Sequence, residues 1–198
     1  FIHSINHDDY KKINDKEHPV LTTPFGIIET GNKNIMISQG STLPYFDGKE
    51  GQIGRQKYQL TRGNTEKNKT AADYALDLLG APYLWGGRTI IGIDCSALIL
   101  NIFKIENFLL PRDASEQVSY GDTVTFMNEA KKGDVCFFDK PDGKITHTGI
   151  LLDNKNIIHA SGEVRIDSID HQGIYNQELK KYTHHLRVIK RFVKKDIK

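Results

Sequence analysis

The feature that most constrains the fold is a glycine-rich stretch, residues 85–96, which runs directly into an apolar run, residues 97–103. Glycines in the first part can adopt backbone conformations closed to other residues, so the loop can turn tightly. The apolar run predicts a buried helix, and Asp94 or Ser96 is the right residue type to cap its N-terminus. Cys95 then lies in the first helical turn, where unpaired N–H groups and the helix dipole stabilise an anion.

Two interpretations of Cys95 follow from this position. A thiolate is an anion, and the same N–H groups can hold the oxyanion of an acyl-transfer intermediate, so Cys95 is a candidate nucleophile. The alternative is a free cysteine buried in a core helix. The stretch alone does not separate the two. The second cysteine, Cys136, lies in an apolar segment that indicates the core of a strand.

Composition narrows the class of protein only slightly. The chain has 198 residues, enough for one large domain or two small ones, and we expect two. No apolar stretch reaches membrane-spanning length, which predicts a soluble protein without a transmembrane segment. A net charge of +2 does not argue for a nucleic-acid partner, although residues 190–195 are locally basic. Because the chain starts at Phe1, we expect its numbering to begin inside a longer precursor whose signal peptide is gone.

Changes in residue pattern predict three parts. Residues 1–19 are polar without a sustained period, as in an arm or the remnant of a preceding module. Residues 20–66 contain short apolar runs separated by Gly, Asn and Asp, which predicts a small all-β barrel. Residues 67–198 predict an α+β domain, reached through a polar linker at residues 61–69. The strands expected in the barrel are residues 25–28, 35–37, 45–46 and 58–60.

The α+β domain is expected to place its helices before its antiparallel sheet. One helix begins after Thr70, which forms a capping box with Asp73, and Gly80 and Pro82 end it. Its apolar face is expected at Ala71, Ala75, Leu78 and Leu79. A short helical piece is expected near residues 114–118. The expected strands are residues 134–139, 146–152, 156–160 and 186–192.

Two histidines offer a base for Cys95. His147 and His159 lie on consecutive predicted strands joined by a turn. If residues 153–155 form a three-residue turn, His159 pairs with Gly149 and both imidazoles share one face; a two-residue turn places them on opposite faces. A peptidase mechanism requires the three-residue turn. In it Cys95 attacks a carbonyl, His147 moves the proton, and His159 orients the ring of His147.

The same three side chains could instead hold zinc, since a cysteine and two histidines are common zinc ligands. No two of them have the close sequence spacing that usually anchors a metal ion. We therefore expect no metal and no cofactor, and the acyl-transfer hypothesis is the stronger one.

Six short motifs follow one another between residues 81 and 161. They are Ala81-Pro82-Tyr83-Leu84-Trp85-Gly86-Gly87, Gly92-Ile93-Asp94-Cys95-Ser96, Leu110-Pro111-Arg112-Asp113, Gly133-Asp134-Val135, His147-Thr148-Gly149-Ile150 and Ile158-His159-Ala160-Ser161. In this order they resemble the NlpC-type cysteine peptidases of bacterial cell walls. The resemblance covers roughly residues 71–192 and implies a permuted papain-like α+β fold.

The resemblance implies a peptidoglycan hydrolase. Its substrate would be the murein stem peptide, cleaved between γ-linked D-glutamate and the diamino acid, meso-diaminopimelate, through a thioester. Cys95 would be the nucleophile, His147 the base and His159 the orienting residue, with Tyr83 as the active-site tyrosine. Substrate contacts would come from Trp85, Asp94, Ser96, Arg112 and Asp113. Asp94, Ser96 and Asp113 would bind a free N-terminal L-alanine where one is required, although Asp94 could be only the helix cap.

Residues 20–60 resemble, more weakly, the bacterial SH3-like modules that precede such catalytic domains. We expect a monomer located in the cell envelope, either periplasmic or secreted, with murein peptides and no nucleic acid as partners. Two other functions remain open: an amidase or acyltransferase of a related Cys/His fold, and a wall-binding module with a degenerate catalytic site. The departures from the family pattern, Ala97 and Cys136, do not touch the triad.

Overall fold

The computed structural model describes residues 7–14 and 16–193. The chain divides into two compact units, Phe1–Glu66 and Lys67–Lys198. Part of the expected arm (residues 1–6 and 15) and the end of the basic tail (residues 194–195) lie outside the described residues. Within the described part, no helix is long and apolar enough to cross a membrane.

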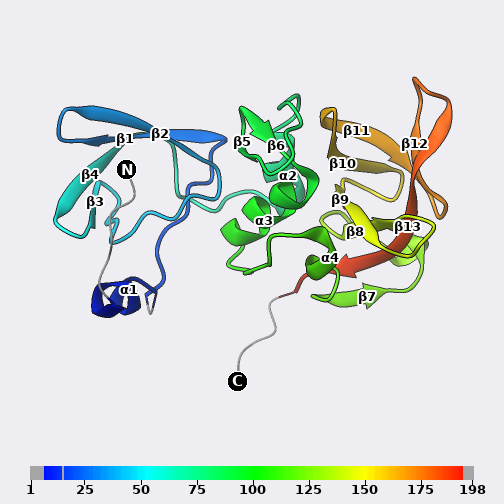
Figure 1. Cartoon of the computed structure of the whole chain (residues 1–198), viewed down its shortest axis with the longest axis horizontal. Coiled ribbons are helices and arrows are strands. Elements are labelled where there is room, and N and C mark those ends of the chain that lie inside the picture. The colour runs from blue at the N-terminus through cyan, green and yellow to red at the C-terminus, as the bar shows by residue number, and fades with distance from the viewer. Residues whose placement is uncertain (1–6, 15, 194–198) are drawn as a thin grey trace. The chain divides into compact units, whose positions relative to one another are not determined.

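The first unit is a small antiparallel sheet preceded by one short helix (Figure 1). The helix, α1, spans His7–Asn14, in a polar segment where the sequence showed no sustained period. The strands follow the spatial order β2-β1-β4-β3. They are β1 (Phe25–Thr30), β2 (Lys33–Ser38), β3 (Glu50–Ile53) and β4 (Gln56–Arg62). Its most buried large side chains come from both strand and loop: Val20, Leu21, Leu43 and Tyr58.

The strand expected at residues 45–46 is wrong. Tyr45 has a φ of 53°, which is turn geometry, and the third strand forms at β3 instead. The apolar pair packs without being extended, because the Phe46 ring stacks on Tyr58 with the centroids 6.4 Å apart. The hydroxyl of Tyr58 also donates to the carbonyl of Pro44, at 2.9 Å. An apolar run therefore indicated burial here but not strand structure.

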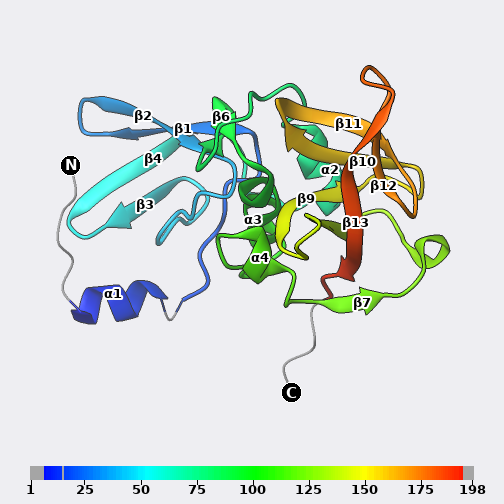
Figure 2. The same ribbon diagram turned by 45° about the vertical axis from the view of Figure 1, so that its right-hand side comes forward.

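The second unit is built on a seven-stranded sheet with the order β12-β11-β10-β9-β8-β13-β7. Because β12 also pairs with β13, strands β8 to β13 close into a ring and β7 extends it at β13 (Figure 2). The strands are β7 (Asp122–Val124), β8 (Val135–Asp139), β9 (Ile145–Leu151), β10 (Asn156–Ser161), β11 (Glu163–Ile169), β12 (Gly173–Asn176) and β13 (Lys181–Arg191). A separate two-stranded hairpin pairs β5 (Arg88–Thr89) with β6 (Gly92–Ile93).

Strands β8, β9, β10 and β13 match the four expected ones, β13 beginning five residues earlier than predicted. Strands β7, β11 and β12 were not expected, because charged residues and glycines interrupt their apolar pattern. The strands share one apolar core, which includes Cys136, so its assignment to strand core is confirmed. The core residues are Val124, Cys136, Phe138, Leu151, Ile157, Ile169, Ile174 and Ile189.

Within the second unit, three α-helices precede the ring in sequence: α2 (Ala71–Leu76), α3 (Cys95–Ile105) and α4 (Ala114–Gln117). A 3₁₀ turn, η1, follows at Met127–Glu129. The predicted capping box of Thr70 and Asp73 is confirmed at the start of α2. Leu79, however, is 54% exposed, so its place on the apolar face was wrong; α2 ends at Leu76, and of the two leucines that follow only Leu78 is buried. Helices α2 and α3 pack against β9 and β10 (Figure 1).

Candidate active site

Cys95 is the first residue of α3, as the sequence predicted. Asp94 is the N-cap, and its Oδ1 accepts a hydrogen bond from the backbone N–H of Ala97 at 2.8 Å. Backbone N–H groups of Cys95, Ser96 and Thr148 act to lower the pKa of the thiol. Since Thr148 belongs to β9, the thiol lies beside the strand that carries His147. The first turn of the helix therefore surrounds the sulfur with donors that favour negative charge.

Burial opposes these donors. It raises the pKa of the Cys95 thiol to about 11, and the neighbouring carboxylate of Asp94 contributes to the rise, while the N–H groups only partly offset it. The thiol is therefore protonated at neutral pH before a substrate binds. A base has to take its proton as the sulfur attacks.

The hairpin of β9 and β10 carries the candidate base, His147. His159 pairs with Gly149 in the observed register, which confirms the predicted three-residue turn. Nε2 of His147 lies 2.9 Å from Nδ1 of His159, and both rings are buried. A Cβ at Gly149 would lie 2.9 Å from the Cβ of His159. Only glycine therefore leaves room for this pair of rings without a shift of the strands.

A carboxylate on β11 continues the chain of hydrogen bonds. Nε2 of His159 lies 3.1 Å from Oδ2 of Asp167. A carboxylate only accepts, so His159 carries its proton on Nε2 and offers the lone pair of Nδ1 to the Nε2–H of His147. Nδ1 of His147 is then the atom with a free lone pair. Asp167 thus fixes the tautomers of both imidazoles and leaves Nδ1 of His147 to act as the base.

Asp167 remains ionised in this position. Its burial alone would raise the pKa of the carboxyl, but hydrogen bonds from His159 and Arg165 lower it overall. Nε of Arg165 lies 3.0 Å from Oδ2 of Asp167. An ionised carboxylate stabilises an imidazolium two rings away, which assists proton uptake by His147.

A third imidazole lies against the pair. The ring of His184, on β13, stacks on His147 with the centroids 4.0 Å apart and the planes 25° apart. The pKa of His147 is well below its usual range because the ring is buried and because His184 and His159 are close. Burial, and then His159, also lower the pKa of His184, to about 4. His147 and His184 are therefore neutral near pH 7.

The residues around the helix cap form an ion-pair network. Oδ1 of Asp94 accepts from Nη1 of Arg112 at 3.0 Å, and Nη2 of Arg112 donates to Oδ2. Arg112 also donates to Oγ of Ser96 at 2.7 Å. The backbone N–H of Gly86, which has a φ of 80°, donates to Oδ2 at 2.8 Å. Asp94 and Arg112, both predicted to bind substrate, thus neutralise each other in the free protein.

The predicted site residues other than the two histidines line one cavity of about 480 Å³. It is lined by Tyr83, Trp85, Asp94, Cys95, Ser96, Arg112 and Asp113, together with residues of α4 and β9 and their flanking turns. Trp85 is 88% exposed and Tyr83 39%. Burial, Cys95 and Asp94 raise the pKa of Tyr83, so its hydroxyl keeps its proton.

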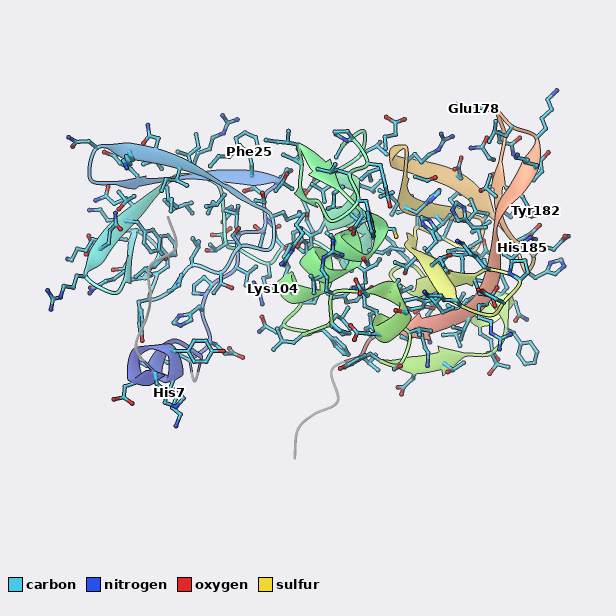
Figure 3. The ribbon with its side chains drawn as sticks, in the orientation of Figure 1. His7, Phe25, Lys104, Glu178, Tyr182 and His185 are labelled. Carbon is cyan, nitrogen blue, oxygen red and sulfur yellow. The ribbon has the colours of Figure 1, made fainter. Side chains whose placement is uncertain are left out.

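His147 lines a second cavity, of about 530 Å³, with Tyr83 and Thr146 common to both cavities. His184 and His185 of β13 line this cavity too, and His185 is labelled in Figure 3. The candidate nucleophile and base thus lie between two hollows that share part of their walls. This arrangement suits an extended substrate with one portion on each side of the reacting bond.

Sequence reasoning missed Asp167 and His184. The place of Asp167 depends on the pairing of β11 with β10, in which Arg165 pairs with His159 and Asp167 lies on the same face of β11 as Arg165. The place of His184 depends on how β13 closes the ring against β12 and β8. The order of strands in that ring comes from the tertiary fold.

The profile of the NlpC/P60 family matches residues 80–187, which contain Cys95 and all three histidines of the cluster. This chain belongs to the NlpC/P60 family. Among curated NlpC/P60 relatives, a protein of Bacillus subtilis (strain 168) named gamma-D-glutamyl-L-lysine dipeptidyl-peptidase is 39% identical over 84 residues. That match covers 41% of this chain and 28% of the relative.

A protein of the same name from Bacillus cereus (strain ATCC 10987) is 34% identical over 147 residues, covering 65% of this chain and 44% of the relative. The chain thus spans less than half the length of these two relatives. The crystal structure of an NlpC/P60 family protein from Bacillus cereus ATCC 10987 superposes with a TM-score of 0.69 at 22% identity. It covers 92% of this chain and 66% of that one, which shows a shared fold.

Proposed function

We propose that this protein is a cell-wall cysteine endopeptidase that cleaves the γ-D-glutamyl–diamino acid bond of murein stem peptides. The observation that carries the proposal is the chain of hydrogen bonds from Asp167 through His159 to His147, beside a cysteine at a helix N-terminus. It supplies a nucleophile, a base of defined tautomer and an orienting pair. The names of the two bacilli relatives support the choice of substrate.

Acylation begins with proton transfer. Nδ1 of His147 takes the thiol proton as Sγ of Cys95 attacks the γ-carbonyl carbon of D-glutamate. The N–H groups at the start of α3, those of Cys95 and Ser96, and the hydroxyl of Tyr83 are the donors proposed for the oxyanion. The intermediate collapses when His147 returns the proton to the α-amino group of the diamino acid, which leaves. The γ-glutamyl portion remains on Cys95 as a thioester.

Deacylation repeats the sequence with water. Water attacks the thioester carbon and gives its proton to His147. The second tetrahedral intermediate then expels the sulfur, which recovers the proton. The free γ-carboxyl product is released, so the cysteine and the histidine end in the states in which they began.

We propose that the part of the substrate that becomes the acyl group carries a free N-terminal L-alanine. An ammonium group needs a carboxylate partner, and the charge of Asp94 is already paired with Arg112. Asp113 lines the same cavity, is exposed, and makes no side-chain hydrogen bond as the N-cap of α4. We assign the ammonium to Asp113, with Ser96 and Trp85 as contacts along the peptide.

The division of the chain into domains is part of the same proposal. Residues 1–19 are an arm or the remnant of a preceding module, residues 20–66 an SH3-like domain, and residues 67–198 a permuted papain-like peptidase domain. The substrate places the enzyme in the cell envelope, periplasmic or secreted.

Defined muropeptides test the proposal. The peptides are L-Ala-γ-D-Glu-L-Lys and L-Ala-γ-D-Glu-meso-diaminopimelate, each with a free and with an N-acylated alanine, and products are identified by mass spectrometry. We expect cleavage after D-glutamate, faster by about tenfold or more for the free amine. Asp113→Asn should reduce this preference, while Cys95→Ala gives no product.

Two outcomes would favour the other functions. Release of the intact stem peptide from its sugar-linked lactyl group would identify an amidase. Binding of murein without any cleavage by the unmodified protein would identify a wall-binding module.

A further inference from the structure

Three imidazoles converge at one end of the closed ring. His147 of β9, His159 of β10 and His184 of β13 each offer a ring nitrogen, and these three atoms lie within 4.8 Å of one another. Two of the rings are buried and the third is half-buried. We propose that this cluster is a binding site for a divalent transition-metal ion such as Zn²⁺, and that the bound ion prevents His147 from acting as a base.

The donor atoms are close to the spacing that zinc requires. Two nitrogens bound to a tetrahedral zinc ion at about 2.0–2.1 Å are roughly 3.4 Å apart. Nε2 of His147 and Nδ1 of His159 are 2.9 Å apart, so opening this hydrogen bond slightly admits the ion. Nδ1 of His184 contacts Oγ1 of Thr183 at 3.0 Å, which leaves its Nε2 as the ligand atom. Imidazole nitrogen is a preferred ligand of zinc, nickel and copper.

One of the three histidines is already oriented by a hydrogen bond from the ring nitrogen that does not face the proposed ion. Metal-bound histidines usually donate their other ring N–H to a carboxylate, which fixes the ring and raises its basicity. His159 makes this contact, because its Nε2 lies 3.1 Å from Oδ2 of Asp167. Its Nδ1 lone pair therefore points toward the cluster before any ion is present.

The ion also has a route of entry. The cavity of about 530 Å³ is lined by both His147 and His184. Three protein ligands leave the fourth tetrahedral position for a water molecule, and this cavity provides the space for it. The zinc ligand set suggested by the sequence, Cys95 with two histidines, is thus replaced by a set in which His184 takes the place of the thiol.

Binding would change the tautomer of His147. In the free protein its Nε2 carries a hydrogen and Nδ1 carries the lone pair. Coordination through Nε2 moves that hydrogen to Nδ1, so no lone pair remains for the thiol of Cys95. Inhibition of hydrolysis rests on the proposed function, whereas binding of the metal does not.

Binding is tested in the full chain carrying Cys95→Ala, which removes the thiol as a competing ligand. Titration calorimetry with Zn²⁺ should show one ion per chain. Adding His184→Gln should weaken binding at least tenfold, while the matched control His171→Gln, at an exposed histidine of the same unit, leaves it unchanged. Absence of binding in Cys95→Ala, or equal affinity with and without His184, would overturn the proposal.

A second measurement does not depend on the folding of the His184 variant. In ¹H–¹⁵N spectra of Cys95→Ala, Zn²⁺ should shift the ring nitrogens of three of the eight histidines. Shifts confined to other histidines would contradict the site. With the unmodified protein, Zn²⁺ should inhibit hydrolysis at least tenfold and a chelator should restore it. If the unmodified protein hydrolyses no muropeptide, the proposed function fails while the binding result stands.

Discussion

The two cysteines of this chain are both buried and both free, yet their surroundings differ. Cys95 starts a helix, lines a cavity and has backbone N–H groups directed at its sulfur. Cys136 is fully enclosed in the apolar core of the ring, where burial, and then the charge of Asp134, raise the pKa of its thiol. Burial by itself therefore does not separate an inert thiol from a nucleophile.

What separates them is access and a partner for the proton. Cys95 has the proposed base, His147, on the neighbouring strand, and His159 and Asp167 hold that imidazole in one tautomer. Cys136 has apolar neighbours on every adjacent strand of its core. The raised pKa of Cys95 means that reactivity depends on the base, and not on a standing thiolate.

Replacing each cysteine by alanine gives the largest expected contrast. Cys95→Ala should lower hydrolysis of the stem peptide by about 10⁴-fold or more, because no other group can form the thioester. Cys136→Ala should keep kcat within about threefold and lose about 1–2 kcal/mol of unfolding free energy, because it leaves a small cavity. Kinetics and denaturant unfolding of both variants measure the contrast. Equal loss of activity in the two variants would remove the distinction between the sites.

Asp167→Asn tests the second difference between the two cysteines, which is the proposed base beside Cys95. Losing the charge that holds His159 should lower kcat about 10–100-fold with little change in KM, since Asp167 positions rings and does not contact substrate. The acid limb of the kcat profile should move, because the imidazolium loses its stabilising charge. Asp170→Asn is the matched control, since Asp170 directly follows β11 but accepts a hydrogen bond from Tyr182 and not from a histidine. An unshifted pH profile in Asp167→Asn would reduce Asp167 to a structural residue.

The smallest expected effect is the pH dependence of kcat/KM in the unmodified enzyme. Burial lowers the pKa of His147 below its usual 6.5 and raises that of Cys95 to about 11. His147 accepts a proton only when neutral, so kcat/KM should fall as pH drops through a midpoint below 6.5. The alkaline limb should lie near pH 11, where the thiol ionises. The two midpoints belong to the coupled pair. An acid midpoint above pH 6.5 would contradict the lowered pKa of His147.

Much of the fold and the site could be predicted from local sequence. The cap at Asp94, the helix that follows it and the three-residue turn between β9 and β10 depend on residues close to one another in the chain. Strand β11 could not be recognised, because charged residues interrupt its apolar pattern, and two of them, Arg165 and Asp167, form an ion pair within the strand. Strand β12 has only four residues and begins at Gly173.

The sequence by itself predicted that Cys95 starts a helix, and the periodicity of strands put His147 and His159 on one face on condition that the turn between them has three residues. Only the tertiary structure decided what those residues face. Closure of the ring brought His184 of β13 against His147, and the pairing of β10 with β11 brought Asp167 to His159. The tertiary structure also paired Asp94 with Arg112, which lies 18 residues further along the chain. Contacts between segments distant in the chain depend on strand order and packing, and no local pattern encodes either.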